Sequence, residues 1–429
     1  MPAAPPSALY ERLAREAFGA APLEGVAEAD VAVVGGGIAG LAAALALRRA
    51  GVATLLLEAA TIGAGASGRN NGQVIPTLTR HDPEAVLKAM GEGRGERFLA
   101  MLQASADRLF DTIARYAIDC DAVRAGWIQP AHTPGRARLA ARRAAQWAGR
   151  GAPAEYLDAT AMAAHLGSAA YAGGWRHAGG GHVNPLAFTR GLARAAQQEG
   201  VRIHEHSRAL RLVREADGWR VFTARGAVRC RKLVVVTAAY ADSLWPGLAR
   251  TVVPVDSYQL ATEILPPGVA ARILPGDEAA SDTRYDLRYF HKDREGRLIS
   301  GGALAIQAFA RQRLPPVVRA RLGAVFPELA GIDFPFFWGG RIAMTTDRLP
   351  RLHRTPDGLI GWTGCNGRGL ALAMGMGEVM RDAVLGVADE QLALAPTKLA
   401  PIPLHGLVRR TARLALLHYR RRDRAEIPG

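Results

Sequence analysis

Three glycines and one acidic residue stand where a nucleotide-binding turn needs them. Gly35, Gly37 and Gly40 form a GxGxxG pattern directly after the apolar run at residues 29–34 and lead into strong helix formers. The first glycine permits a tight turn, the second lets a pyrophosphate approach the helix N-terminus, and the third lets the helix pack closely on the strand. Glu58 ends the next apolar run, where a carboxylate can accept hydrogen bonds from ribose hydroxyls. The pattern therefore predicts a dinucleotide site.

A second polar run, "GAGASGRNNGQV" at residues 63–74, follows the acidic residue. Its small residues would let backbone lie against a flat ring system, and Ser67 and Arg69 could hold a pyrophosphate. An NAD enzyme normally continues from the acidic residue into another strand–helix unit, whereas this chain continues into a loop. The run therefore favours an extended FAD, which needs contacts at both of its ends. The amides that could meet the polar edge of its ring belong to Asn70, Asn71 and Gln73.

Buried strands that alternate with helices must position these motifs. The apolar runs before Gly35 and before Glu58 flank a helical segment, which predicts parallel strands with helices on the faces of their sheet. Strand-like pieces are scattered along the whole chain, so we expect an α/β fold with two interleaved domains. The expected Rossmann-like FAD-binding domain comprises residues 1–82, 155–250 and 337–429, and the expected α+β substrate domain comprises residues 83–154 and 251–336.

The composition is that of a soluble globular protein, with 49% hydrophobic and 22% charged residues. No stretch approaches the roughly 20 apolar residues of a membrane span, and no basic region followed by an apolar core predicts a signal peptide. Cys120, Cys230 and Cys365 form neither a metal-ligand spacing nor a disulfide framework. We therefore expect a cytoplasmic protein without a metal site.

The net charge of +15 comes almost entirely from arginine, which is spread along the chain as a compositional bias. That spread argues against nucleic-acid binding. The densest basic run, residues 407–424, predicts a helix with an arginine face and an apolar stripe of Leu407, Leu414 and Leu417. We expect the stripe to dock on the protein, and peripheral contact with a membrane is the less favoured alternative.

Seven motifs together resemble the D-amino-acid oxidase-like (DAO) family of FAD-dependent oxidoreductases, in particular its gamma-glutamylputrescine oxidase-like branch. They span nearly the whole chain and read "VAVVGGGIAGLAAALAL", "GASGRNNGQ", "GGGHVNPLAF", "LVVVTAAYADSL", "SDTRYDLRYF", "GGRIAMTTDRLPRL" and "GCNGRGLALAMGMGEVM". The resemblance implies an FAD domain and a substrate domain whose β-sheet roofs the flavin. The residues expected to contact the cofactor are Gly35, Gly37, Ile38, Ala39, Gly40, Glu58, Ser67, Arg69, Asn70, Asn71, Gly72, Gln73, Thr237, Ala238, Arg341, Asn366, Gly367, Arg368, Gly369 and Leu370. For Arg341 a structural ion pair is the alternative.

Two departures from the family pattern bear on the cofactor. Some relatives attach FAD through a cysteine in the segment that matches "GGRIAMTTDRLP"; this segment has none, so the resemblance implies noncovalent FAD. Relatives of the sarcosine oxidase type place a lysine over the flavin for oxygen reactivity, whereas Lys292 falls in a predicted hairpin turn. Oxidase and dehydrogenase activity therefore both stay open.

Substrate contacts are expected from strands that face the flavin. An aromatic wall could select an apolar part of the substrate, and an arginine could pair with a carboxylate. Alternate residues of a strand face one side, so either the arginines or the tyrosines of the 284–289 segment line the pocket. The candidates are Tyr258, Arg284, Tyr285, Arg288 and Tyr289. We expect a structural role for His182 and exposed positions for His291 and His353.

The absence of an evident acid–base pair fits hydride transfer from the carbon of a neutral amine to flavin N5. The sequence thus predicts FAD-dependent oxidation of a CH–NH bond to an imine in an amine or amino acid, with gamma-glutamylputrescine-like compounds implied by the resemblance. Dioxygen is the expected electron acceptor, giving hydrogen peroxide. The alternatives are a membrane-surface dehydrogenase that passes electrons to a quinone and a non-catalytic flavin-binding protein. An NAD-linked dehydrogenase is weaker, because no second nucleotide motif occurs.

Overall fold

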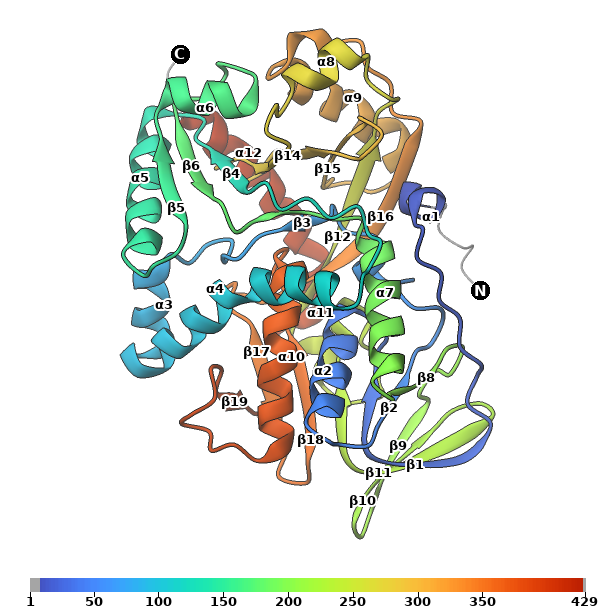
Figure 1. Cartoon of the computed structure of the whole chain (residues 1–429). Coiled ribbons are helices and arrows are strands. Elements are labelled where there is room, and N and C mark those ends of the chain that lie inside the picture. The colour runs from blue at the N-terminus through green and yellow to red at the C-terminus, as the bar shows by residue number, and fades with distance from the viewer. Residues whose placement is uncertain (1–7, 427–429) are drawn as a thin grey trace.

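A computed structural model of the chain describes residues 8–426. Two large β-sheets, each covered by helices, form its frame (Figure 1). The extreme ends of the outer predicted domain ranges, residues 1–7 and 427–429, lie outside the described residues. No helix within residues 8–426 has the length and hydropathy needed to cross a bilayer.

The first sheet has nine strands, and its centre is parallel. Its order is β19-β17-β18-β11-β1-β2-β8, with β10 and β9 added to β11 as an antiparallel extension. β1 pairs in parallel with β2 and β11, so the carboxyl ends of these strands lie at one edge of the sheet. The strands are β1 Gly25–Val34, β2 Thr54–Leu57, β8 Arg202–His204, β9 Arg211–Glu215, β10 Gly218–Phe222, β11 Gly226–Val235, β17 Arg351–Arg354, β18 Leu359–Thr363 and β19 Pro396–Thr397.

Helix α2, Ile38–Arg49, carries the chain from β1 to β2, as the sequence predicts. Its run from Leu41 to Leu47 is buried, because α10, Gly369–Leu385, packs on it. A Cβ on Gly377 of α10 would lie 2.7 Å from Cβ of Ala42, so glycine permits this close contact. The two helices thereby bring the turn after β1 and the loop after β18 to the same region.

The second sheet has eight strands in the order β16-β12-β15-β14-β13-β4-β6-β5. Its outer face packs on α9 and forms a second core around Leu260, Phe290, Leu314 and Leu322. β3, Gln73–Val74, and β7, Gly181–His182, form a separate two-stranded sheet. Each of them joins, along the chain, a strand of one large sheet to a strand of the other. The strands of the second sheet are β4 Trp127–Pro130, β5 Ala154–Leu157, β6 Gly174–His177, β12 Val253–Ala261, β13 Ala279–Ser281, β14 Tyr289–Lys292, β15 Leu298–Gly302 and β16 Phe336–Met344.

The structure moves several elements across the predicted domain boundaries. β5, β6 and β16 fall largely in ranges expected for the FAD domain, yet they pair within the second sheet. Helix α4, Glu92–Arg115, falls in a range expected for the substrate domain, yet it packs on α10. The sheet to which each of these strands belongs depends on a pairing partner far away in the sequence, and local composition does not indicate that partner.

The C-terminal segment crosses from the first sheet to the second. After β19 it forms α11, His405–Thr411, and α12, Ala415–Ala425 (Figure 1, red), and α12 contacts the loop between β13 and β14 through Asp423. The remaining helices are α1 Leu9–Leu13, α3 Pro83–Met90, α5 Pro134–Ala148, α6 Ala159–Leu166, α7 Pro185–Gln198, α8 Pro267–Arg272 and α9 Ala310–Gly323.

Candidate active site

The glycine-rich turn has the geometry that its sequence predicts. Gly35 has a φ of +117°, which disfavours any side chain. A Cβ on Gly40 would overlap the carbonyl oxygen of Gly35, because α2 packs directly on the end of β1. Gly37 caps α2 without a side chain, and the N–H of Ile38 donates to Ser67 Oγ at 3.0 Å. The run at residues 63–74 therefore lies against the helix N-terminus.

Glu58 lies beside this turn. Its carboxylate accepts the N–H of Gly36 at 2.7 Å and the N–H of Ala60 at 2.9 Å. Burial raises the pKa of the Glu58 carboxyl. These backbone contacts fix the carboxylate next to the turn, which is the position that binding of a ribose requires.

A cavity of about 560 Å³ lies among the glycine-rich turn, the second sheet and the C-terminal segment. Its volume falls in the range of about 300–1,000 Å³ that small-molecule sites occupy. The structure brings most of the expected cofactor residues to its wall, namely Gly37, Ile38, Ala39, Ser67, Arg69, Asn70, Asn71, Gln73, Ala238, Arg341, Asn366, Gly367, Arg368, Gly369 and Leu370. The expected residues that do not line it are Gly35, Gly40, Glu58, Gly72 and Thr237.

Buried polar atoms without partners test whether the wall fits FAD. Gln73 donates its amide N–H groups to the carbonyl oxygens of Ala280 and Phe290, which leaves its Oε1 with no partner. Gln259 Oε1 and Arg368 Nη1 are likewise buried and unpartnered among the described residues. An unmet buried polar atom costs about 1–3 kcal/mol. Gln73 and Gln259 line the cavity, so its wall offers unpartnered acceptor oxygens to a ligand with hydrogen-bond donors, as FAD has. Arg368 lines the cavity as well, but its guanidinium lies 4.7 Å from the ring centre of Trp127, beside a second small cavity.

The loop before α10 supplies an electropositive end to the cavity. Asn366 has a φ of +51°, and its Oδ1 accepts the N–H of Thr345 at 2.9 Å. This contact fixes the turn that starts the 17-residue helix at Gly369. The partial positive charge at a helix N-terminus stabilises nearby negative charge. Gly369 and Leu370, the first residues of α10, line the cavity, so this positive end of the helix faces it.

The predicted substrate residues divide between the cavity and the protein interior. Tyr285 and Tyr289 line the cavity, whereas Arg284 and Arg288 do not. Arg284 instead forms an ion pair with buried Asp282. Only Tyr289 of these four residues lies in a strand, so strand alternation is not what separates the tyrosines from the arginines. The separation comes from a turn around Asp282, whose carboxylate accepts the N–H of Arg288 and directs the arginines away from the cavity.

Tyr258, another predicted substrate residue, does not line the cavity either. Its ring stacks on Phe337 with centroids 5.3 Å apart and faces the second core. Its neighbours on β12, Ser257 and Gln259, line the cavity instead. Alternation along β12 therefore turns the predicted tyrosine away from the site.

Arginines give the cavity a positive wall, and four of them were not identified from the sequence, namely Arg80, Arg348, Arg409 and Arg413. Arg80 lies with its guanidinium 4.4 Å from the ring centre of Tyr285, and Arg348 donates to the hydroxyl of Tyr419 at 3.2 Å. Neither has a carboxylate within 4.0 Å among residues 8–426, and burial lowers the pKa of Arg80. Asp286, which also lines the cavity, is already paired with Arg321 and Arg420. Uncompensated guanidinium groups fit an anionic ligand.

Arg341 meets both of its predicted alternatives. It lines the cavity, and its Nε lies 3.2 Å from Asp256 Oδ1. The position over the cavity comes from β16, and the ion pair joins β16 to β12.

The C-terminal segment covers one side of the cavity. Val408, Ala412, Leu416 and Tyr419 line it, and the ring of Tyr419 stacks on Tyr285 with centroids 5.7 Å apart. The predicted docking through the leucine stripe is wrong, because Leu407, Leu414 and Leu417 are 58%, 57% and 46% exposed. The helix packs instead through small residues, one tyrosine and one acid.

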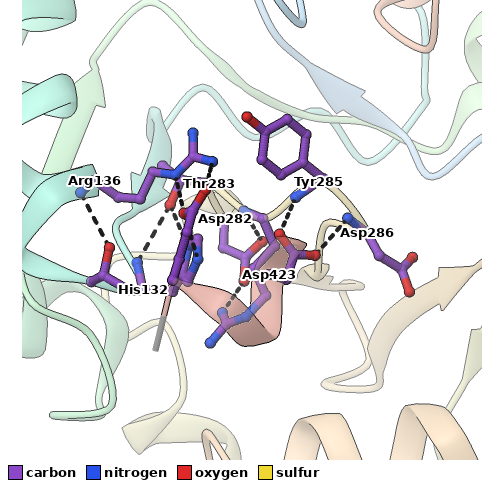
Figure 2. Close-up of polar contacts among 10 residues, drawn as sticks. His132, Arg136, Asp282, Thr283, Tyr285, Asp286 and Asp423 are labelled. Carbon is purple, nitrogen blue, oxygen red and sulfur yellow. Dashed lines mark hydrogen bonds and ion pairs between the residues drawn. The ribbon is translucent and has the colours of Figure 1, made fainter. Parts of the chain in front are cut away.

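Asp423 anchors the far end of this segment (Figure 2). Its carboxylate is buried and accepts the N–H of Tyr285 at 2.8 Å and the N–H of Asp286 at 3.0 Å. Arg136 of α5 adds a two-bond ion pair with Glu426, each bond 2.6 Å long. Asp423 is the one acidic residue in the basic run at residues 407–424, and this reversal of charge is the signal that could have identified it.

His182 and His291 support the segment that carries the predicted flavin amides. His291 and His353 are each 2% exposed, which corrects the expectation that they are exposed. The rings of His291 and His182 lie against each other, with centres 4.5 Å apart and planes tilted by 32°, and His291 Nε2 lies 2.6 Å from the carbonyl oxygen of Asn71. Burial lowers the pKa of His291 to about 3, so the imidazole is neutral and holds the Asn71 backbone in place.

Comparisons with known proteins agree with this geometry. A family model described as FAD dependent oxidoreductase (DAO) matches residues 30–383. The probable oxidoreductase OrdL of Rhizobium meliloti (strain 1021) is 30% identical over 406 residues, which is 94% of each chain. Gamma-glutamylputrescine oxidoreductase of Escherichia coli (strain K12) is 30% identical over 376 residues, 87% of this chain and 88% of that one. The crystal structure of glycine oxidase from Geobacillus kaustophilus has the same fold, with a TM-score of 0.69 at 23% identity over 87% of this chain and 99% of that one.

Proposed function

The chain belongs to the DAO family of FAD-dependent oxidoreductases, and we propose that it oxidises the CH–NH bond of a small amine or amino acid that carries a carboxylate. The observation that carries this proposal is the cavity itself, which joins the glycine-rich turn, the loop before α10, and Arg80 and Arg348, neither of which has a carboxylate within 4.0 Å among residues 8–426. The activities for which the E. coli and Geobacillus relatives are named support an amine or amino-acid substrate. A gamma-glutamylputrescine-like compound has both the amine and the carboxylate that the cavity wall fits.

FAD would lie along the wall from α2 to α10. The N-terminus of α2, with Gly37 and Ser67, would receive the pyrophosphate, and Glu58 the ribose. The amides of Asn71 and Gln73 and the N-terminus of α10 would meet the ring. Bound FAD supplies the acceptor for the two electrons that leave the CH–NH bond.

The residues of the chain would bind the substrate and exclude water from it. Arg80 and Arg348 would pair with the carboxylate, and the rings of Tyr285 and Tyr289 would flank the apolar part. Burial raises the pKa of Tyr289 to about 12, so its hydroxyl stays protonated and donates to the carbonyl oxygen of Tyr258 at 3.2 Å. The C-terminal segment would close the cavity, which holds the reacting groups in one orientation and keeps bulk water away.

We further propose noncovalent FAD, dioxygen as the acceptor and a cytoplasmic location. Cys365 is the cysteine that lines the cavity, and burial raises the pKa of its thiol, which disfavours the nucleophilic thiolate that attachment would need. All three cysteines are free thiols, which suits a reducing compartment. Acid precipitation that releases all yellow colour into the supernatant would support noncovalent binding.

An anaerobic absorbance titration tests the proposed function. Purified holoprotein is mixed with gamma-glutamylputrescine, glycine, D-amino acids and putrescine, and bleaching of the flavin band is followed. We expect bleaching by carboxylated amines. Arg80→Met and Arg348→Met should each raise the concentration of a carboxylated amine needed for half bleaching at least 10-fold, with no such rise for putrescine, which lacks a carboxylate.

Readmission of air then identifies the acceptor. Rapid return of the yellow colour supports an oxidase, whereas slow return in air and rapid return with a soluble quinone supports a dehydrogenase. A yellow protein that none of the amines bleaches would favour a non-catalytic flavin-binding protein. A colourless protein that takes up no FAD would refute the proposal.

A further inference from the structure

The outer face of the C-terminal segment carries a regular stripe of leucine and arginine. Positions 407, 410, 414, 417, 421 and 424 are spaced by alternating steps of three and four, which is the spacing of one side of a continuous α-helix. The segment is helical over these positions, as α11, a 3-10 turn at Ala412–Leu414 and α12. They are occupied in order by Leu, Arg, Leu, Leu, Arg and Arg, and all six are exposed. We call these six residues the outer stripe. Leu404, immediately before α11, is also 76% exposed.

The fold of the chain does not need the outer stripe. The opposite face supplies the packing residues Val408, Ala412, Leu416 and Tyr419 and the buried anchor Asp423. None of the three arginines of the outer stripe has a carboxylate within 4.0 Å among residues 8–426. The stripe therefore has both its apolar surface and its charge available to something outside the chain.

Two further apolar side chains extend the exposed surface beyond the helix. Ile306 is 61% exposed and Phe309 is 75% exposed. Gln307 between them donates to Asp256, whose carboxylate also pairs with Arg341 of β16 and lies 3.8 Å from Arg413 of the C-terminal segment. The loop at residues 306–309 and the C-terminal segment therefore both contact Asp256.

We propose that the outer stripe docks the protein on an anionic lipid surface. Leucines would enter the boundary between headgroups and acyl chains, and arginines at the same level would pair with lipid phosphates. A second copy of the chain is a poorer match, because a helix paired with itself through this face would bring arginine rows close to one another. The membrane contact that the sequence left as a minor alternative is therefore favoured by the orientation of the helix, and it does not depend on the identity of the substrate.

Vesicle sedimentation with the FAD-loaded, full-length protein tests this proposal. Vesicles of phosphatidylglycerol and phosphatidylcholine in equal parts are compared with vesicles of phosphatidylcholine alone. We expect binding to the anionic vesicles, weak binding to the neutral ones, and a decrease with added salt. Leu414→Ser/Leu417→Ser should lower the partition coefficient about 10-fold, and Arg410→Glu/Arg421→Glu about 30-fold.

Matched controls use exposed residues far from the segment. Leu210→Ser/Leu385→Ser changes two leucines that are 57% and 50% exposed, and Arg231→Glu reverses an exposed charge on β11; neither should alter vesicle binding. Flavin bleaching by amines is measured on the same samples, so failure of the proposed function stays distinguishable from failure of docking. The proposal is overturned if the wild type ignores anionic vesicles, or if the stripe variants bind as the controls do. It is also overturned if light scattering shows a dimer that the leucine variants dissociate, since a second copy would then occupy the stripe.

Discussion

Replacement of Asp423 by alanine should open the cover over the cavity while the rest of the protein stays folded. The carboxylate accepts two backbone N–H groups, from Tyr285 at 2.8 Å and from Asp286 at 3.0 Å. A hydrogen bond to a charged acceptor contributes about 1.5–3 kcal/mol, so loss of both costs about 3 kcal/mol at the low end. Because 1.4 kcal/mol is a factor of ten, the ratio of open to closed cover should rise roughly 100-fold.

Trypsin cleavage within the C-terminal segment measures this ratio. Exposed arginines such as Arg409, Arg410 and Arg421 must leave the helix before the protease can cut beside them. We expect Asp423→Ala to be cut roughly 100-fold faster than the wild type, and its KM for a carboxylated amine to rise more than its kcat falls. Asp423→Asn keeps one acceptor oxygen and should lie between the two.

A matched control separates anchoring from general destabilisation. Asp158→Ala removes an exposed helix cap on α6, where Asp158 Oδ1 accepts the N–H of Ala161 at 2.8 Å, and it should leave cleavage of the C-terminal segment unchanged. Equal cleavage rates for Asp423→Ala and the wild type would refute the anchoring role. A large fall in melting temperature for Asp423→Ala would also contradict it, because the cover would then be part of the cooperative core.

Three further predictions concern the interior. Gly40→Ala should lower the free energy of unfolding by about 3 kcal/mol in urea titrations, because its Cβ would overlap the carbonyl oxygen of Gly35; Gly331→Ala, which meets open space, should change little. Burial lowers the pKa of His291 to about 3 and of His177 and His353 to about 4, so each stays neutral when folded but takes up a proton near pH 6.5 when unfolded. Stability is then fully present above pH 6.5 and falls towards pH 4 by about 1.4 kcal/mol per pH unit and histidine, and His291→Gln should reduce the slope in pH-dependent urea titrations. Arg368 is buried without a charge partner among the described residues, and burial lowers its pKa to about 9, so Arg368→Leu should raise the melting temperature of the apoprotein and weaken FAD uptake; a lower melting temperature would show that its contact with Trp127 dominates.

The proximity of the residues proposed to bind FAD could be predicted because their signals are local. Each signal follows a strand in the sequence. The turn at Gly35–Gly40 follows β1, and Glu58 and the run from residue 63 to 74 follow β2. A parallel sheet brings the carboxyl ends of neighbouring strands to one edge, so adjacency follows from the strand order alone. The loop at Asn366 joins them for the same reason, since β18 pairs beside β11 in that sheet.

The substrate half could not be predicted, because its residues depend on contacts between distant segments. Arg80 and Arg348 belong to loops that read as ordinary polar connections, and only the cover formed by Tyr419 brings them to one wall. The failure of Arg284 and Arg288 has the same origin. Asp282 organises a turn where alternation suggested a strand, and an alternation rule has no meaning outside a strand.

The two faces of the C-terminal helix are linked, and this linkage gives one more prediction. Hydrophobic periodicity indicated the right helix but the wrong contact face, because the cavity wall takes Ala412, Ala415 and Tyr419 and leaves the leucines outside. A lipid surface that binds the outer stripe of the ordered helix, and not an unfolded segment, must stabilise the closed cover by the same free energy. Anionic vesicles should therefore slow trypsin cleavage of the wild-type segment and partly restore resistance in Asp423→Ala, with neutral vesicles as the control. Faster cleavage on anionic vesicles would mean that the membrane binds the C-terminal segment in its open state. Membrane binding would then uncover the cavity and would not stabilise the closed cover.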